Sequence, residues 1–301
     1  MSTLESIPGI QKNINLASHS SWLVGGKADF FCEPKNIDEL INTQKICQLN
    51  KTPLTILGGG TNVLISDKGV RGVVISLSRL TGIEILEDKE KLKFWALTGT
   101  AKSELLKIFL KYKLDPAAFL GGLPGQVGGG VVMNAGVGEK LTPREFHEIT
   151  EAIEVLKPNG TLEILDAKKL KWGYRHCQGW QPGIITRVKI AWRNISNPDI
   201  LNVVRTLNQT RLQKQPLEYP SCGSVFRNPL PLHSGKLIED LGLKGREIGG
   251  AQISMKHANF IVNKGGATAE DIKSLMNLCI NSVKEKYNIK LHTEVVWLGD
   301  K

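Results

Sequence analysis

Several features of membrane, secreted and nucleic-acid-binding proteins are missing from this sequence. No apolar run approaches the roughly 20 residues that a membrane-spanning helix needs. Residues 1–9 lack the basic and apolar regions of a secretory signal. The five cysteines are far apart without a CxxC pair, which predicts reduced thiols. Lys and Arg form no dense run of the kind that binds nucleic acid. These absences predict a cytoplasmic protein with no membrane insertion and no nucleic-acid partner.

Two common kinds of catalytic motif are absent as well. The six histidines show neither HExxH nor a paired Cys/His spacing, so we expect no metal. No serine lies in a GxSxG elbow, which argues against a hydrolase of that type.

The composition indicates a globular chain that attracts anions. Of 301 residues, 41% are apolar and 23% are charged, which is enough apolar surface for a folded core. The length exceeds one typical core, so we expect two or three lobes. The net charge of +10 favours nucleotides, phosphates and carboxylates as ligands.

The hydrophobic patterns predict an α+β protein. Helices are expected at residues 37–50, 235–241 and 269–286, and a further long helix runs through Leu212. Strands are expected at residues 53–57, 72–77, 149–157, 161–165, 183–192, 259–262 and 295–298, and those from 149 to 192 are expected to be antiparallel. Chain breakers at 194–199 place the main domain boundary there.

A first glycine-rich segment, Gly58-Gly59-Gly60-Thr61-Asn62, follows an expected strand. Without side chains, backbone amides can surround a phosphate. The spacing matches neither GxGxxG nor GxxxxGK[ST], so the common nucleotide motifs do not apply. A tight turn between strands is the alternative.

A second glycine-rich segment runs from Phe119 to Gly130 and is followed by Asn134-Ala135-Gly136. So many glycines leave little to pack, which favours a ligand pressed against backbone. A bend or barrel corner is the alternative.

Three polar segments carry candidate chemistry. Arg175 lies beside aromatic residues, where its guanidinium can hold a carboxylate. Ser224 lies in a Ser-Cys-Gly-Ser turn, and Glu294 lies in an apolar strand. Their alternatives are a surface salt bridge, a turn hydroxyl and a solvent-facing strand residue.

Taken in order, these segments resemble the UDP-N-acetylenolpyruvoylglucosamine reductase family. The resemblance runs from Asn15 to Gly299. Its motifs are His19 with Gly-Gly-Lys-Ala-Asp, Gly-Gly-Gly-Thr-Asn, Gly-Leu-Pro-Gly-Gln-Val-Gly-Gly with Asn-Ala-Gly, Tyr-Arg, Pro-Ser-Cys-Gly-Ser, Gly-Gly-Ala-Gln, Lys-His-Ala-Asn-Phe and Thr-Glu-Val.

The resemblance implies a fold and a reaction. The fold is an FAD-binding domain of the vanillyl-alcohol oxidase type at residues 1–196, with two lobes divided near 78, followed by a UDP-sugar substrate domain at 197–301. The reaction is NADPH-driven reduction of UDP-N-acetylglucosamine enolpyruvate to UDP-N-acetylmuramate, for peptidoglycan precursors, with non-covalent FAD.

The resemblance also implies site residues. Ser224 is the proton donor, and Arg175 and Glu294 stabilise the intermediate. The expected cofactor-binding residues are Gly58, Gly59, Gly60, Thr61, Asn62, Gly121, Pro124, Gly125, Gly128, Gly129 and Asn134. The expected substrate-binding residues are Tyr174, Arg211, Lys214, Gly223, Arg227, Lys236, Gln252, His257 and Asn259.

The sequence departs from the family pattern at a few places. Thr61 replaces a common serine, and Ser20-Ser21-Trp22 is a weaker match. The chain passes from Arg175 to Gly183 without a long insertion, so it resembles the shorter form that lacks the tyrosine loop. The alternatives are an FAD oxidase of the same fold and a non-catalytic flavin- or UDP-sugar-binding protein. The oligomeric state is not predicted.

Overall fold

The computed structural model describes residues 3–137 and 141–300, which form two compact units. Unit 1 comprises Met1–Gln11, Phe31–Gly59 and Val74–Thr210. Unit 2 comprises Lys12–Phe30, Gly60–Val73 and Arg211–Lys301. The units interleave along the chain, whereas the predicted domains are linear segments, so the boundary near residue 197 stays a prediction.

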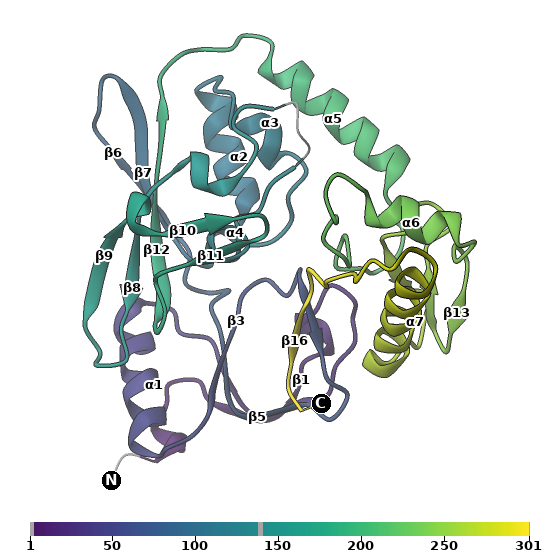
Figure 1. The fold of residues 1–301 in the computed structure, drawn as a ribbon. Coiled ribbons are helices and arrows are strands. Elements are labelled where there is room, and N and C mark those ends of the chain that lie inside the picture. The colour runs from purple at the N-terminus through teal and green to yellow at the C-terminus, as the bar shows by residue number, and fades with distance from the viewer. Residues whose placement is uncertain (1–2, 138–140, 301) are drawn as a thin grey trace. The chain divides into compact units, whose positions relative to one another are not determined.

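Unit 1 is built on a five-stranded antiparallel sheet of order β6-β7-β12-β8-β9 (Figure 1). The strands are β6 (Ile83–Leu86), β7 (Lys91–Leu97), β12 (Ile184–Arg193), β8 (Thr150–Leu156) and β9 (Leu162–Asp166). Alternate residues of β7 are buried, as expected of a strand with one face on a core. In the register, Val188 pairs with Ala96 on one side and with Ile153 on the other.

The helices and short strands of unit 1 complete this layer. The helices are α1 (Ile37–Leu49), α2 (Lys102–Lys111), α3 (Ala117–Leu120), α4 (Val127–Val132) and α5 (Ile200–Lys214), the last of which extends past Thr210 into unit 2. The remaining elements are β3 (Leu54–Leu57), the hairpin of β10 (Lys171–Gly173) and β11 (His176–Gln178), and the 3-10 turns η1 (Leu4–Ser6), η3 (Phe146–Glu148) and η4 (Ala167–Lys169). Helix α1 begins where the Asn36 side chain accepts the Glu39 N–H.

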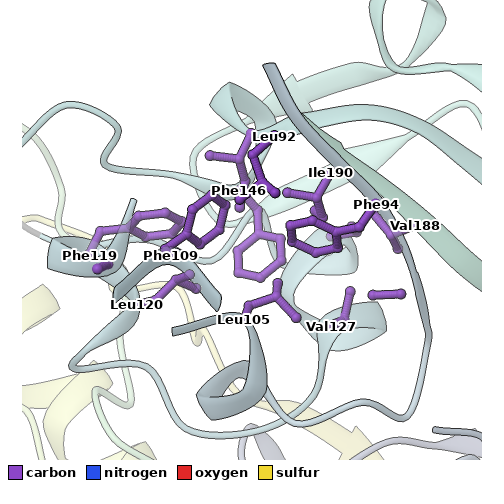
Figure 2. Packing of buried hydrophobic residues seen from close by; sticks show 14 of the residues in the cluster. Leu92, Phe94, Leu105, Phe109, Phe119, Leu120, Val127, Phe146, Val188 and Ile190 are labelled. Atoms are coloured by element: carbon purple, nitrogen blue, oxygen red, sulfur yellow. The ribbon is translucent and has the colours of Figure 1, made fainter. Parts of the chain in front are cut away.

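Four phenylalanine rings lie among aliphatic side chains in the core of unit 1 (Figure 2). Phe94 and Phe109 have ring centroids 5.9 Å apart, and Phe119 meets Phe146 edge to face at 5.9 Å. All four are fully buried, and each such side chain stabilises the fold by roughly 1.5–3 kcal/mol. The core therefore joins the sheet to α2, α3 and η3.

Unit 2 packs two helices against small sheets. Its helices are α6 (Ser234–Asp240), α7 (Ala269–Tyr287) and the 3-10 turn η2 (Ala17–His19). Strands β13 (Glu247–Ile248), β14 (Ala251–Ile253) and β15 (Ile261–Asn263) form an antiparallel sheet, and β16 (Val296–Leu298) pairs in parallel with β4 (Val63–Ile65). The division between units falls within β2 (Lys27–Cys32) and β5 (Val70–Ser76), which belong with β1 (Gln11–Asn15) and β3 to a sheet of order β1-β2-β5-β3.

Two local features stabilise unit 2. Trp22 is completely buried, and its Nε1 donates to the Ile261 carbonyl at 2.7 Å. Helix α7 begins with a capping box of Thr268 and Asp271 and ends at Asn288 in the left-handed conformation. A buried indole with its N–H satisfied fixes the N-terminal segment against β15.

The mixed helix and strand content and the elements expected from the sequence are confirmed, with ends shifted by at most two residues. The five cysteines are free and buried, in agreement with the expected thiols. Within residues 3–137 and 141–300, no helix has both the length and the apolar character needed to cross a bilayer.

Candidate functional site

The two glycine-rich segments meet in unit 1. A Cβ at Gly59 would lie 3.4 Å from Gly125 Cα, and a Cβ at Gly58 would lie 3.4 Å from Gln126 Oε1. The end of β3 therefore contacts the loop before α4, although the two are far apart in the sequence.

The start of α2 and the residues just before it hold this loop in place. Val127 N–H donates to the Thr100 carbonyl at 2.9 Å, and Lys102 N–H donates to the Gly125 carbonyl at 3.0 Å. The Lys102 ammonium donates to the Pro124 carbonyl at 2.9 Å and lies 5.5 Å from the Phe146 ring centroid. Burial, with a smaller effect from the positive charge of Arg175, lowers the pKa of Lys102 to about 8. The desolvated ammonium of Lys102 is thus in direct contact with the second glycine segment.

The glycines of this loop fall into two groups, those where a side chain would clash and those where it would not. A Cβ at Gly128 would meet Thr98 Oγ1 at 1.9 Å, and one at Gly130 would meet the Phe146 ring at 2.4 Å, so packing explains both. Gly59 and Gly129 are exposed; a Cβ at Gly129 would meet nothing within 4 Å, and one at Gly59 would make only ordinary contacts. Packing therefore does not explain these two.

Gln126 adds a second sign of a ligand at the same place. Its Nε2 donates to Ser78 Oγ at 3.0 Å, while its buried Oε1 has no hydrogen-bond partner. A buried amide oxygen without a donor is costly. Exposed glycine backbone beside such an atom suits a bound cofactor whose hydroxyl or ring N–H groups supply the donor.

The rest of the first glycine motif belongs to unit 2. Gly60 has a φ of +65°, and a Cβ there would lie 1.9 Å from the His19 carbonyl oxygen, so a tight turn explains this glycine. The Asn62 side chain donates to the Glu294 carbonyl at 3.0 Å. The preceding residue, Thr61, is half-buried. Asn62 therefore holds the segment that carries Glu294.

Ser224 and Glu294 lie on neighbouring segments of unit 2. Glu294 N–H donates to the Val225 carbonyl at 2.8 Å, and Phe226 pairs with Thr293 in an antiparallel bridge. Asn259, which is buried, clamps Phe226: its Oδ1 accepts the Phe226 N–H and its Nδ2 donates to the Phe226 carbonyl, both at 2.9 Å. Asn259 thus holds the segment next to Ser224, and its expected contact with substrate stays a prediction.

The turn before Ser224 combines a buried thiol with an open glycine. Cys222 Sγ lies 3.4 Å from the Val63 carbonyl oxygen, and burial raises its pKa to about 12, which makes it an inert thiol. Gly223 has a φ of +77° and nothing within 4 Å of a Cβ position. Backbone conformation alone therefore requires glycine at position 223.

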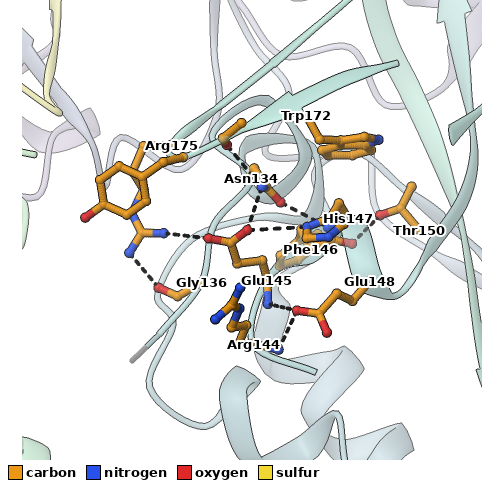
Figure 3. Close-up of polar contacts among 12 residues, drawn as sticks. Asn134, Gly136, Arg144, Glu145, Phe146, His147, Glu148, Thr150, Trp172 and Arg175 are labelled. Atoms are coloured by element: carbon orange, nitrogen blue, oxygen red, sulfur yellow. Dashed lines mark hydrogen bonds and ion pairs between the residues drawn. The ribbon is translucent and has the colours of Figure 1, made fainter. Parts of the chain in front are cut away.

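Arg175 lies at the turn of the β10–β11 hairpin in unit 1 (Figure 3). Its φ is +61°, an uncommon conformation for a residue other than glycine. Its Nη2 donates to the Gly136 carbonyl at 2.9 Å, and its guanidinium stacks on Tyr174 with 4.9 Å between guanidinium carbon and ring centroid. Nη1 lies 3.9 Å from Glu145 Oε1.

Asn134 is committed to this arrangement. Its Nδ2 donates to Glu145 Oε2 at 2.9 Å and to the Gly173 carbonyl at 3.1 Å, and its Oδ1 accepts the His147 N–H at 3.0 Å (Figure 3). The buried side chain thus contacts protein groups through its amide nitrogen and its oxygen. The amide therefore holds Glu145, Gly173 and His147 together, and the expected contact of Asn134 with the cofactor stays a prediction.

The remaining expected substrate residues of unit 2 have varied surroundings. Arg211 Nε donates to Gln215 at 2.8 Å, and burial lowers the pKa of Arg211. Lys214 is exposed, Arg227 is half-buried, and Lys236 is an exposed partner of Asp240, which raises the pKa of Lys236. Gln252 donates to Glu247 at 2.6 Å, and burial lowers the pKa of His257. Among these, the paired and exposed Lys236 has the surroundings of an ordinary surface cation.

Sequence reasoning missed three residues of the site: Lys102, Gln126 and Glu145. Gln126 lies inside the glycine motif, and its polar side chain among glycines was a usable signal. Lys102 and Glu145 resemble solvated surface charges in the sequence, and only the chain path reveals that Lys102 is buried and Glu145 half-buried.

Two family models match this chain. The model described as an FAD binding domain matches residues 28–166, and the C-terminal domain of UDP-N-acetylenolpyruvoylglucosamine reductase matches residues 215–298.

Curated relatives and a solved structure match nearly the whole chain. The reductase of that name from Caldanaerobacter subterraneus is 39% identical over 293 residues, covering 96% of this chain and 93% of its own length. The one from Clostridium botulinum is 39% identical over 287 residues, covering 95% and 91%. The crystal structure of UDP-N-acetylenolpyruvylglucosamine reductase from Thermus caldophilus is 30% identical with a TM-score of 0.78, covering 95% of this chain and 97% of its own.

These matches confirm the expected fold class and FAD-binding domain. The two glycine-rich segments of unit 1 also fit the cofactor, because Gly59 and Gly129 are exposed and Gln126 Oε1 has no hydrogen-bond partner. The chain belongs to the UDP-N-acetylenolpyruvoylglucosamine reductase family.

Proposed function

We propose that this protein is an FAD-dependent reductase that uses NADPH to convert UDP-N-acetylglucosamine enolpyruvate into UDP-N-acetylmuramate. Membership of the reductase family, at 39% identity over 96% of the chain, carries this proposal. The exposed glycines at 59 and 129 support a cofactor at unit 1. The proposed place of the reaction is peptidoglycan precursor synthesis in the cytoplasm, where NADPH and UDP-sugars are found.

The cofactor supplies hydride transfer from NADPH to the vinyl carbon of the substrate. Hydride addition there makes a methyl group and moves an electron pair toward the adjacent carbon and its carboxylate. A proton at that adjacent carbon completes the lactyl ether. The protein must therefore stabilise negative charge at the carboxylate and deliver one proton.

Arg175, Ser224 and Glu294 are the residues proposed for these tasks. The Arg175 guanidinium is pre-oriented by Gly136 and Tyr174, which suits it to pair with the carboxylate. Ser224 follows an open glycine and is proposed as the proton donor, with a neighbouring group replacing its proton. Glu294, on the segment next to Ser224, is proposed to stabilise the enolate-like species by donating a hydrogen bond from a neutral carboxyl group.

The substrate's diphosphate requires cations, and unit 2 supplies candidates. Arg211 and Arg227 are half-buried, whereas Lys214 and Lys236 are exposed. We propose the two arginines as the principal diphosphate partners, because a partly desolvated guanidinium makes stronger paired hydrogen bonds. The other expected contacts with the substrate are minor ones in this proposal, and they come from Lys214, Lys236, Gln252 and His257.

The proposal is tested under anaerobic conditions by separating the two half-reactions. The flavin is first reduced with NADPH, the enolpyruvyl substrate is then added, and the return of the oxidised flavin spectrum is followed. Rapid reoxidation is expected for the wild-type protein. We expect Arg175→Ala, Ser224→Ala and Glu294→Ala to bind FAD and to lose about 100-fold or more in the reoxidation rate.

A matched control is Arg193→Ala, which removes an exposed arginine stacked on Trp192 at the end of β12. This variant is expected to react like the wild type. Failure of wild-type protein to reoxidise with substrate, with prompt recovery on admitting oxygen, would support an FAD oxidase instead. Flavin binding without either reaction would support a non-catalytic binding protein.

A further inference from the structure

Glu145, at the start of η3, is surrounded by groups of the candidate site (Figure 3). Its Oε2 accepts from Asn134 Nδ2 at 2.9 Å and lies 3.4 Å from His147 Nδ1. Its Oε1 lies 3.9 Å from Arg175 Nη1. The side chain is 18% exposed and that of Arg175 is 17% exposed, so water screens this pair less than it screens a surface pair.

The chain is built to hold Glu145 in this position. Glu145 and Glu148 form a capping box around η3, in which Glu148 Oε1 accepts the N–H groups of Arg144 at 2.9 Å and Glu145 at 3.2 Å. A Cβ at Gly136 would lie 2.4 Å from the Arg144 carbonyl oxygen and 2.6 Å from Glu145 Cγ, so the backbone and this side chain both require glycine there. The Asn-Ala-Gly motif thus supplies a donor to this carboxylate and lets the chain pass close beside Glu145.

Arg175 needs such support because of its backbone. A non-glycine residue at a φ of +61° occupies a sparsely populated conformation, which persists only where the surroundings hold it. Gly136 supplies a carbonyl to one guanidinium nitrogen, and Glu145 supplies a negative charge to the other. Gly136 and Glu145 are themselves paired in an antiparallel bridge.

We propose that Glu145 is a positioning residue of the reaction, which fixes the direction of the Arg175 guanidinium together with the Gly136 carbonyl. This inference rests on the proposed role of Arg175 toward the substrate carboxylate. Asn134 orients the Glu145 carboxylate, and Glu145 in turn orients Arg175. A misplaced guanidinium would meet the carboxylate of the substrate less well as negative charge develops.

The test is Glu145→Gln, which keeps the shape and the acceptor for Asn134 but removes the negative charge. We expect reoxidation of the reduced flavin by the enolpyruvyl substrate to slow by about 10- to 100-fold. Flavin reduction by NADPH and the FAD dissociation constant, measured by flavin fluorescence, are expected to stay within about twofold, because unit 1 is otherwise unchanged. Glu145→Asp, which keeps the charge, should recover part of the lost rate.

Glu148→Gln is the matched control, because it removes a negative charge from the same turn while its side-chain oxygen can still accept the N–H groups of Arg144 and Glu145. It should reoxidise at the wild-type rate; a loss equal to that of Glu145→Gln would assign the effect to the turn and overturn the proposal.

A double mutant separates positioning from an independent effect. In an Arg175→Ala background, Glu145→Gln should cause no further loss, because the residue through which it acts is gone. Losses that multiply would overturn the proposal. If Glu145→Gln reoxidises at the wild-type rate while Arg175→Ala is slow, only the positioning role of Glu145 would be overturned. Wild-type reoxidation by Arg175→Ala would overturn the proposed role of Arg175 itself.

Discussion

The buried Lys102 makes the stability of this protein depend on pH in a predictable way. Its side chain is enclosed below the second glycine segment, with only 5% of the residue exposed. Burial, followed by the charge of Arg175, lowers its pKa from the ordinary 10.5 to about 8. At about 1.36 kcal/mol for each pKa unit, this drop corresponds to about 3 kcal/mol of differential stabilisation.

The direction of the effect follows from proton linkage. Below pH 8, Lys102 is charged in both the folded and the unfolded chain, and the cost of burying the charge is fully present. Between pH 8 and 10.5 the unfolded chain keeps the proton that the folded chain has lost, so the free energy of unfolding rises with pH. Lys102→Met keeps an apolar stem and lacks this dependence.

The assay is urea unfolding followed by circular dichroism at several pH values from 7 to 10.5. We expect the stability of the wild type minus that of Lys102→Met to rise by about 3 kcal/mol over this range, since other titrations cancel in the difference. Lys107→Met, which removes an exposed lysine of the same helix, is the control and should give a flat difference. A flat or falling difference for Lys102→Met would refute the reasoning.

Three substitutions test the packing of the two units, each by urea unfolding. Phe94→Ala empties a fully buried position of unit 1 and should destabilise the protein by about 3–5 kcal/mol. Gly60→Ala forces a Cβ to within 1.9 Å of the His19 carbonyl oxygen at a φ of +65° and should cost more than about 2 kcal/mol. Thr268→Ala removes the N-cap of α7 and should cost about 1 kcal/mol. A cost near zero in any of them would contradict the packing described at that position.

Some elements could be predicted from local signals in the sequence and others could not, and length does not separate the two groups: the short strands β15 and β16 were predicted, whereas β7 was not. Helices α1 and α7 begin at capping side chains, Asn36 and Thr268, and their local signals agree with the final fold. Helix α2 has no side-chain cap at Ala101, and the prediction missed it. The three-residue strands β10 and β11 were also missed, because they exist through their pairing with each other.

For the candidate site, the types and the order of the residues could be used to find the motifs, but the contacts between their side chains could not be predicted from the sequence. The glycine motifs and the segments of Arg175, Ser224 and Glu294 could be read from the sequence. The predicted cofactor contact of Asn134 stays a prediction, and nothing in the sequence indicated that its side chain also holds Glu145. Glu145 itself carries no local signal, because a carboxylate in a loop is ordinarily solvated.

The sequence by itself determined the α+β class, the family and the kinds of group in the site, because these depend on local patterns and on the order of short motifs. The tertiary structure alone decided which glycines serve packing and which are left open, since that depends on atoms brought from distant segments, such as Phe146 against Gly130. It also decided the burial of Lys102 and the contact of Glu145 with Arg175. Desolvation and charge pairing act through space, so the path of the chain sets them.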